Sequence, residues 1–250
     1  MSATVLPAVE VEEEDGVVYP ESDGQPLAET SLHVKVLILL YSLLEHRYRE
    51  RSDVLLAMDL FWYWKKGDPS ACTAPNLMVI FGAGNQERRS YKLWRENNIV
   101  PAIILEVASE STWRQRLFDN RADYERLGVS EYFLFDPEDD YLPEQLMGFR
   151  LQQGRYRPIT LDEQGFMVSQ TLNLKLKPVG RYLRAFDPVT HVMELYGYEL
   201  VLAEKQRADA ERQQKEEERR QKEDALKEVD ALRAQLAQLR AEHGLSPQPE

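Results

Sequence analysis

The sequence predicts an α/β domain followed by a long, charged C-terminal helix. Three observations predict this fold class. Short runs rich in β-branched and aromatic residues alternate with a helical stretch in the middle of the chain. From residue 194 onward Glu, Lys, Arg, Gln, Ala and Leu dominate, which is the composition of a long helix. The length of 250 residues suits one well-buried domain with an appendage.

Composition limits the function classes and the compartment. The formal net charge of -12 opposes nonspecific wrapping of nucleic acid, so any such contact needs a local basic patch. Cys72 is the single cysteine, which excludes an intrachain disulfide and favours a reducing compartment. The acidic N-terminus is unlike a signal peptide, and no apolar run is long enough to cross a bilayer. We therefore expect a cytoplasmic protein with no membrane partner.

The N-terminal part predicts a lead-in and one amphipathic helix. Residues 1–18 are acidic and lack hydrophobic periodicity, so we expect a disordered segment. Thr30 or Ser31 can cap a helix in which Glu29 precedes the first turn, where a carboxylate favours the helix dipole. Apolar residues then recur at three-to-four spacing: Leu32, Val36, Leu37, Leu40, Leu43 and Leu44.

The middle of the chain predicts strands around a second helix. The expected strands are residues 54–64, 77–81, 102–108 and 131–135, followed by a meander of residues 148–151, 155–159 and 165–174. A helix over residues 114–127 separates two of these strands. It ends at Gly128, which suits a left-handed C-terminal cap.

The C-terminal segment predicts a helix over residues 194–243 and a tail over residues 244–250. Within it, apolar residues alternate by four and three, as in a heptad seam: Ala225, Val229, Leu232, Leu236 and Leu239. This pattern predicts a homodimer or a partner helix through residues 225–239. Residues 205–224 have no seam and predict a solvated helix.

Three features could carry chemistry. Glu106 stands alone in an apolar strand, which is costly unless a metal or cation compensates it; otherwise it points outward at the solvent end of the strand. Asn76 follows Pro75 and by itself is typical of a turn. The basic and aromatic residues between Arg88 and Arg95 could follow a phosphate backbone or form a solvated loop.

Three linked segments, residues 74–80, 104–112 and 124–137, together resemble the Uma-type restriction endonuclease family. The similarity includes Glu29 and His33 and covers about residues 19–186. The resemblance implies a restriction-endonuclease-like core of the PD-(D/E)XK superfamily, with a central mixed sheet flanked by helices. It also implies a Mg²⁺-dependent DNA phosphodiester hydrolase.

The same resemblance identifies the site residues. In such a site carboxylates hold Mg²⁺ against the phosphate, and a lysine orients or activates the attacking water. Glu29 and Glu106 match the metal-side carboxylates, whereas Asn76 stands where the family has Asp. Asn120 stands at the lysine position, and Arg116 stands where the family tends to have Asp. The implied metal set is therefore Glu29, Asn76 and Glu106, and the catalytic positions are Glu106 and Asn120.

These losses leave several functional hypotheses. The first is a Mg²⁺-dependent DNA endonuclease whose active site is degraded at Asn76 and Asn120. Asp119 and Arg121 lie about 100° from Asn120 around the helix, so neither replaces the lost lysine without a register change. The second is a noncatalytic, nuclease-derived binding or assembly module that acts through its C-terminal helix. The third is DNA binding without cleavage, which requires the cluster of residues 88–95 to be exposed beside Glu106.

Overall fold

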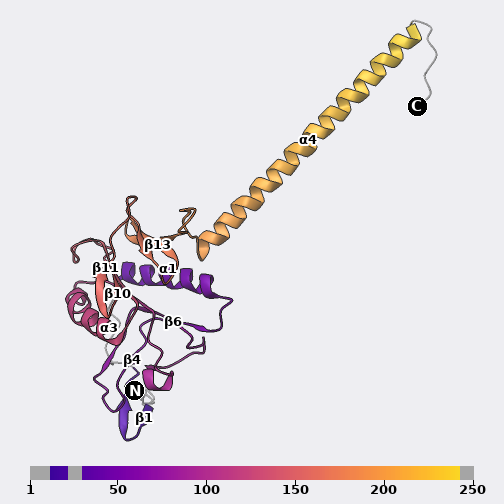
Figure 1. The fold of residues 1–250 in the computed structure, drawn as a ribbon. Helices are drawn as coiled ribbons and strands as arrows, with labels where there is room; N and C mark the ends of the chain where they lie inside the picture. Colours follow the sequence, from indigo (N-terminus) through magenta and orange to yellow (C-terminus); the bar gives the residue numbers. More distant parts are fainter. Residues whose placement is uncertain (1–11, 22–29, 243–250) are drawn as a thin grey trace, which may run out of the picture. The chain divides into compact units, whose positions relative to one another are not determined.

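A computed structural model describes residues 12–21 and 30–242. Its centre is a six-stranded sheet in the order β11-β10-β9-β8-β6-β3. The strands are β3 (Val54–Ala57), β6 (Leu77–Phe81), β8 (Ile103–Val107), β9 (Glu131–Phe135), β10 (Leu146–Gln152) and β11 (Arg155–Pro158). Strands β8 and β9 are parallel and the other neighbours are antiparallel, so the sheet is mixed. The predicted fold class, a mixed sheet with helices and a long C-terminal helix, is confirmed (Figure 1).

Helix α1 (Ser31–Tyr48) covers one face of this sheet. The Thr30 hydroxyl accepts a hydrogen bond from the His33 amide at 3.2 Å, so the predicted cap is present. The apolar side of α1 packs on strand residues at alternate positions, such as Leu105 and Phe133. The predicted helix and its buried face are therefore confirmed.

The opposite face carries a composite helix. It consists of α2 (Trp113–Gln115), a π-helical stretch η2 (Arg116–Asn120) and α3 (Arg121–Leu127). Gly128 ends it at φ 90°, a left-handed conformation that a glycine adopts without steric cost. Tyr124 of this helix packs with strand residues such as Ile104 and Leu134. The two faces of the sheet thus bury two separate apolar clusters.

Two smaller sheets correct the predicted strands. The single strand expected over residues 54–64 is broken: β4 (Trp62–Tyr63) pairs with β5 (Cys72–Thr73) and β7 (Tyr91–Lys92), next to the short helix η1 (Leu93–Arg95). Asp59 at φ 46° turns the chain between β3 and β4. The strand expected over residues 165–174 is also divided, into β12 (Met167–Ser169) and β13 (Leu174–Val179), which form a sheet with β14 (Tyr182–Phe186).

The described part of the lead-in is folded. Strands β1 (Glu12–Glu14) and β2 (Val17–Tyr19) form an antiparallel hairpin around Asp15 and Gly16, which have φ 53° and 77°. Tyr19 is completely buried. The expectation of disorder is therefore wrong for residues 12–18, because the Asp15-Gly16 turn closes a hairpin that the buried Tyr19 anchors.

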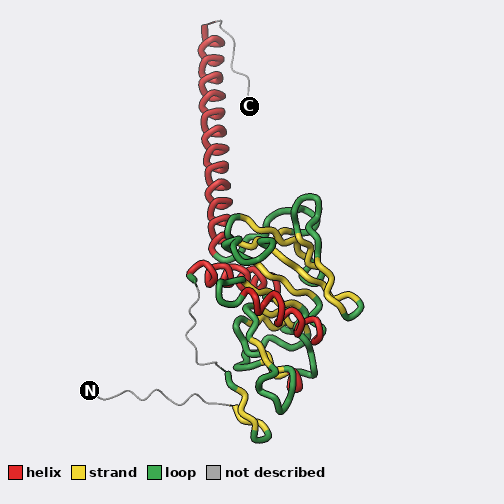
Figure 2. The backbone as a smooth tube through the Cα atoms, turned by 90° about the vertical axis from the view of Figure 1, so that its left-hand side faces the viewer, coloured by secondary structure: helices red, strands yellow, loops and turns green. Residues whose placement is uncertain are grey.

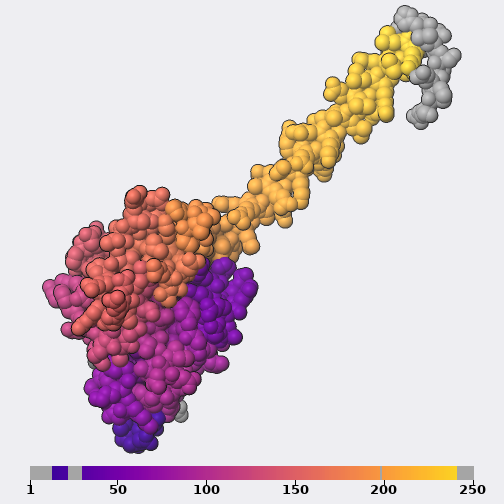
Figure 3. Space-filling model, viewed as in Figure 1, coloured from indigo at the N-terminus to yellow at the C-terminus, as the bar shows by residue number. Residues whose placement is uncertain are grey.

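The chain divides into a first unit ending at Gly197 and a second beginning at Tyr198. The first unit is a layered structure of sheets, helices and connecting loops (Figure 2). The second contains α4 (Tyr198–Glu242), a helix of 45 residues whose side chains are exposed along nearly its whole described length (Figure 3). None of the helices in the described ranges is long and apolar enough to cross a membrane.

Candidate functional site

Glu106 lies on the face of the sheet that the composite helix covers. Its neighbours Leu105 and Val107 pack on the α1 side, and the alternation of a strand turns Glu106 to the other side. Its side chain is 1% exposed. This burial excludes the solvent-facing interpretation, and so the carboxylate requires compensation inside the protein.

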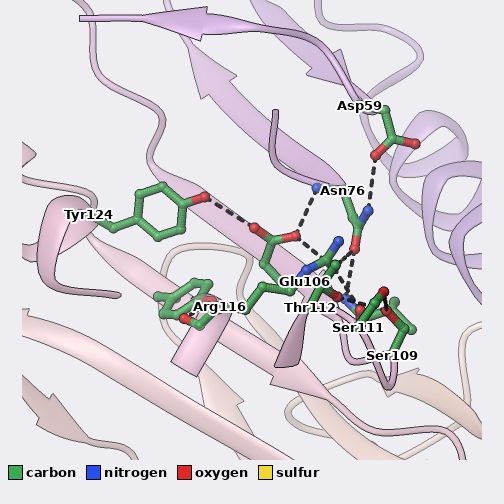
Figure 4. Close-up of polar contacts among 10 residues, drawn as sticks. Asp59, Asn76, Glu106, Ser109, Ser111, Thr112, Arg116 and Tyr124 are labelled. Carbon is green, nitrogen blue, oxygen red and sulfur yellow. Dashed lines mark hydrogen bonds and ion pairs between the residues drawn. The ribbon is translucent and has the colours of Figure 1, made fainter. Parts of the chain in front are cut away.

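Three groups compensate the Glu106 carboxylate (Figure 4). Oε2 accepts a hydrogen bond from the backbone amide of Asn76 at 3.0 Å and lies 3.0 Å from Nη1 of Arg116. Oε1 accepts a hydrogen bond from the hydroxyl of Tyr124 at 3.1 Å. Both carboxylate oxygens therefore already have partners from within the chain.

The Asn76 side chain is equally engaged. Its Oδ1 accepts hydrogen bonds from the backbone amide of Val107, at 3.1 Å, and from Nη1 of Arg116. Its Nδ2 donates to Oδ1 of Asp59 at 2.9 Å. Since Asn76 is 4% exposed, this amide joins strands β6 and β8 to the loop after β3 rather than lining an open surface.

Arg116 supplies the positive charge at the centre of the cluster. It begins the π-helical stretch, is 8% exposed, and donates from Nη1 to the carbonyl oxygen of Val107 at 2.6 Å. The hydroxyl of Tyr132 donates to the Arg116 carbonyl oxygen at 2.9 Å, which fixes the backbone in the widened turn. The guanidinium thus lies against Glu106 and Asn76 at once.

The other predicted site residues are not seen in this cluster. Asn120 ends the π-helical stretch and is half-buried. Asp119 is exposed, and the Arg121 guanidinium lies 5.0 Å from the centre of the Phe149 ring. Glu29 lies outside the described residues. The π-helical stretch does shift the register of the helix. The side chain that it brings to Glu106 is that of Arg116, and not that of Asp119 or Arg121.

Burial and charge change the acidity of the surrounding groups. Burial raises the pKa of Tyr124 well above its usual range, and the nearby Glu106 carboxylate adds to this effect. Burial also raises the pKa of Asp59, although Asn76 and Arg116 oppose it. On α1, His33 is 2% exposed, and burial together with the Arg116 charge lowers its pKa to about 4.

The donor atoms in this cluster do not fit a Mg²⁺ ion. Mg²⁺ binds oxygen ligands in a near-octahedral shell. Here the oxygens of Glu106 and Asn76 accept from Arg116 and from backbone amides, so a metal would have to displace a guanidinium from the same atoms. Within residues 12–21 and 30–242, no group of three or more His, Cys, Asp or Glu side chains could hold a metal ion.

The basic-aromatic cluster of residues 88–95 is paired with acidic side chains. Arg88 forms an ion pair with Glu96 at 2.7 Å and is largely buried. The other pairs reach the N-terminal segment: Arg89 with Glu21 at 2.5 Å, and Arg95 with Glu14 at 3.0 Å. Lys92 is 3% exposed and lies 4.8 Å from the centre of the Tyr19 ring. The charge available to a phosphate backbone is therefore reduced.

Two members of the Glu106 cluster were missed in the sequence. Asp59 belongs to a segment whose sequence predicts one continuous strand. The turn at Asp59 itself, between β3 and β4, places its carboxylate next to Asn76. Tyr124 begins one of the segments that resemble the family, but the sequence does not predict its hydrogen bond to Glu106. Arg116 precedes Tyr124 by eight residues, which puts both on one side of a helix; this spacing was the available signal.

Comparison with known proteins gives one family match. No curated protein matches the chain. A solved structure titled "Crystal structure of a putative nuclease belonging to DUF820 from Anabaena variabilis ATCC 29413" is similar with a TM-score of 0.43 and 16% identity, covering 64% of this chain and 80% of that one. The Uma2 family model, described as "Putative restriction endonuclease", matches residues 6–178. Since this match spans more than half of its length, the chain belongs to the Uma2 family of restriction-endonuclease-like proteins.

Proposed function

We propose that this Uma2 family member is a noncatalytic binding or assembly module that keeps a nuclease fold with a degraded active site and acts through α4. The observation that carries the proposal is the buried ion pair between Arg116 and Glu106, 3.0 Å apart. By family resemblance, the ancestral activity was Mg²⁺-dependent cleavage of DNA.

The guanidinium supplies the positive charge that a metal ion would otherwise bring to Glu106. Arginine stays protonated at all physiological pH values, so this compensation is permanent. Displacing the guanidinium would leave a buried cation unpaired, at a cost of about 3–5 kcal/mol. The resemblance places acidic residues at positions 76 and 116, and this chain has an amide and a cation there. These substitutions argue against metal binding.

The lysine position adds a second argument against catalysis. Asn120 cannot act as a charged group that orients or activates water.

The acidic partners of Arg89 and Arg95 also argue against tight DNA binding, as does the net charge of -12. Cleavage therefore remains only the alternative hypothesis.

The test is nicking of supercoiled plasmid in Mg²⁺ or Mn²⁺. Three proteins are compared: the natural chain, Glu106→Ala, and a triple variant carrying Asn76→Asp, Arg116→Asp and Asn120→Lys. We expect no nicking by the natural chain and no heat of Mg²⁺ binding in titration calorimetry. The triple variant restores the charges of the family pattern and is expected to bind Mg²⁺.

The Glu106→Ala variant serves as the control for contaminating nuclease. Nicking by the natural chain that disappears in Glu106→Ala would refute the noncatalytic assignment. Nicking by both proteins to the same extent identifies a contaminant. Cleavage by the triple variant alone would show that Arg116, Asn76 and Asn120 are the changes that silenced the site.

A further inference from the structure

An exposed apolar stripe follows one side of α4. Its members are Val229, Leu232, Leu236 and Leu239, with exposed fractions of 43, 57, 51 and 53%, and it starts at Ala225. Single exposed leucines are ordinary, but a row at alternating spacing of four and three is the seam of a coiled coil. We propose that α4 pairs with α4 of a second copy of this chain as a parallel, in-register, two-stranded coiled coil over residues 225–239. This inference rests on the proposed assembly role of α4.

The seam residues favour two parallel strands. The spacing places Val229 and Leu236 at heptad position a, and Ala225, Leu232 and Leu239 at position d. A β-branched residue at a next to leucine at d is the pattern that parallel dimers prefer. The alanine at the first d position lets the two helices approach closely where the seam begins.

The flanking charges decide the orientation. Glu228 lies at position g, and Arg233 lies at position e of the next heptad. In a parallel pair, g of one helix faces this e position of the other, so Glu228 meets Arg233 of the second copy twice. In an antiparallel pair e faces e, and Arg233 would meet Arg233. The charge pattern is therefore attractive only in the parallel arrangement.

The same charges favour a second copy over a different partner helix. Each α4 carries both the Glu228 and the Arg233 needed for the pair, so two identical helices satisfy one another completely. Within one helix Arg233 lies 3.9 Å from Asp230, an exposed contact that contributes little. It therefore competes weakly with pairing between copies.

Pairing stops upstream of Ala225. Continuing the heptads backward puts four charged residues at a and d: Lys222, Glu218, Lys215 and Glu211. In register, each would face its own copy and repel it. Instead, contacts within the helix stabilise this stretch, such as Lys215 with Glu211 at 2.6 Å and Arg219 with Glu223 at 3.7 Å. A seam this short gives a dimer that dissociates on dilution.

The first experiment measures the mass of the full chain by sedimentation equilibrium over a range of concentrations. We expect a reversible monomer-dimer equilibrium for the natural chain. Leu232→Glu with Leu236→Glu is expected to be monomeric at every concentration tested. The matched control is Ala231→Glu with Ala234→Glu, which adds the same charge on the outer side of α4 and is expected to dimerise.

Charge reversal tests the orientation. Glu228→Arg and Arg233→Glu, each alone, place like charges opposite one another twice per dimer and are expected to weaken dimerisation roughly tenfold. The double reversal restores opposite charges and is expected to recover the natural affinity. A natural chain that stays monomeric, or a double reversal that fails to recover, overturns the proposal.

Cross-linking gives an independent measure of orientation in a Cys72→Ser background. Ala225→Cys is expected to form a disulfide with itself, because in-register parallel helices bring equal positions together. Positions 225 and 239 lie about 21 Å apart along one helix. If Ala225→Cys cross-links only when it is mixed with Leu239→Cys, the helices are antiparallel and the proposal is wrong.

These results separate the two proposals. A monomeric chain that does not cleave plasmid removes the second-copy partner and leaves the noncatalytic assignment in place. A dimeric chain whose cleavage of plasmid depends on Glu106 removes the noncatalytic assignment and leaves the second-copy partner in place.

Discussion

Arg116 and Glu106 neutralise one another in the interior, so we expect each to depend on the other for stability. Arg116→Met leaves the Glu106 carboxylate buried without its cation and is expected to lower the free energy of unfolding by about 3–5 kcal/mol. Adding Glu106→Gln removes the charge and should recover most of that loss. Urea unfolding of the natural chain, both single variants and the double variant measures the coupling.

The exposed ion pair of Arg126 and Asp123, at 2.7 Å, provides the control. Arg126→Met is expected to change stability by less than about 1 kcal/mol. If Arg116→Met and Arg126→Met have equal effects, the buried pair does not carry the charge compensation that we ascribe to it.

His33 predicts a loss of stability in acid. Its pKa is about 4 in the folded chain, because of burial and the Arg116 charge, and about 6.5 in an unfolded chain. The unfolded state therefore binds a proton first as the pH falls. The contribution of the neutral His33 is complete above pH ~6.5 and declines by up to about 3 kcal/mol towards pH ~4.

Urea unfolding at a series of pH values checks this expectation. His33→Gln removes the titrating group. The free energy of unfolding of the natural chain minus that of the variant should therefore increase as the pH rises from ~4 to ~6.5. Parallel curves would show that His33 does not titrate differently in the two states.

Among the elements, the β1-β2 hairpin and the two residues after it hold acidic side chains against the basic-aromatic cluster. Glu14 receives the Trp94 indole N–H at 3.2 Å, and Glu21 lies 2.5 Å from Arg89. We expect Glu14→Gln with Glu21→Gln to raise the affinity for duplex DNA at low salt. The reason is that Arg95 loses the carboxylate of Glu14 and Arg89 loses that of Glu21. The gain should vanish as salt rises.

Fluorescence anisotropy with a labelled duplex measures that change. Glu13→Gln with Glu87→Gln makes the same change in net charge at exposed positions that are outside these ion pairs. Equal affinities for both double variants would show that net charge alone, and not the hairpin, limits DNA binding.

Local signals predicted the elements that they control. The Thr30 cap, the apolar face of α1 and the left-handed Gly128 each depend on neighbouring residues, and each is present. The break after β3 was not predicted, because Trp62 and Tyr63 have the composition of a continuing strand and only their pairing with β5 and β7 assigns them to another sheet. Partner choice between strands is not encoded in one segment.

At the scale of the whole molecule, the candidate site was also predictable only where neighbouring residues decide its structure. The isolation of Glu106 in an apolar strand left two interpretations open, a buried and compensated carboxylate or one that points to solvent, and the structure buries it. The resemblance placed Arg116 at a site position, but the sequence did not predict its ion pair with Glu106. That contact requires β8, the turn before β6 and a π-helical register together, and these come from distant parts of the chain.

The buried pair also restricts the evolutionary routes open to the protein. Three substitutions separate the chain from the family pattern, and one of them, Arg116→Asp, removes the cation that pairs with the buried Glu106, at about 3–5 kcal/mol. A typical domain has only about 5–15 kcal/mol in total. If the site is silent, as proposed, Arg116→Asp is therefore the costliest step back towards a metal-binding site, and the ion pair makes that step hard to take first.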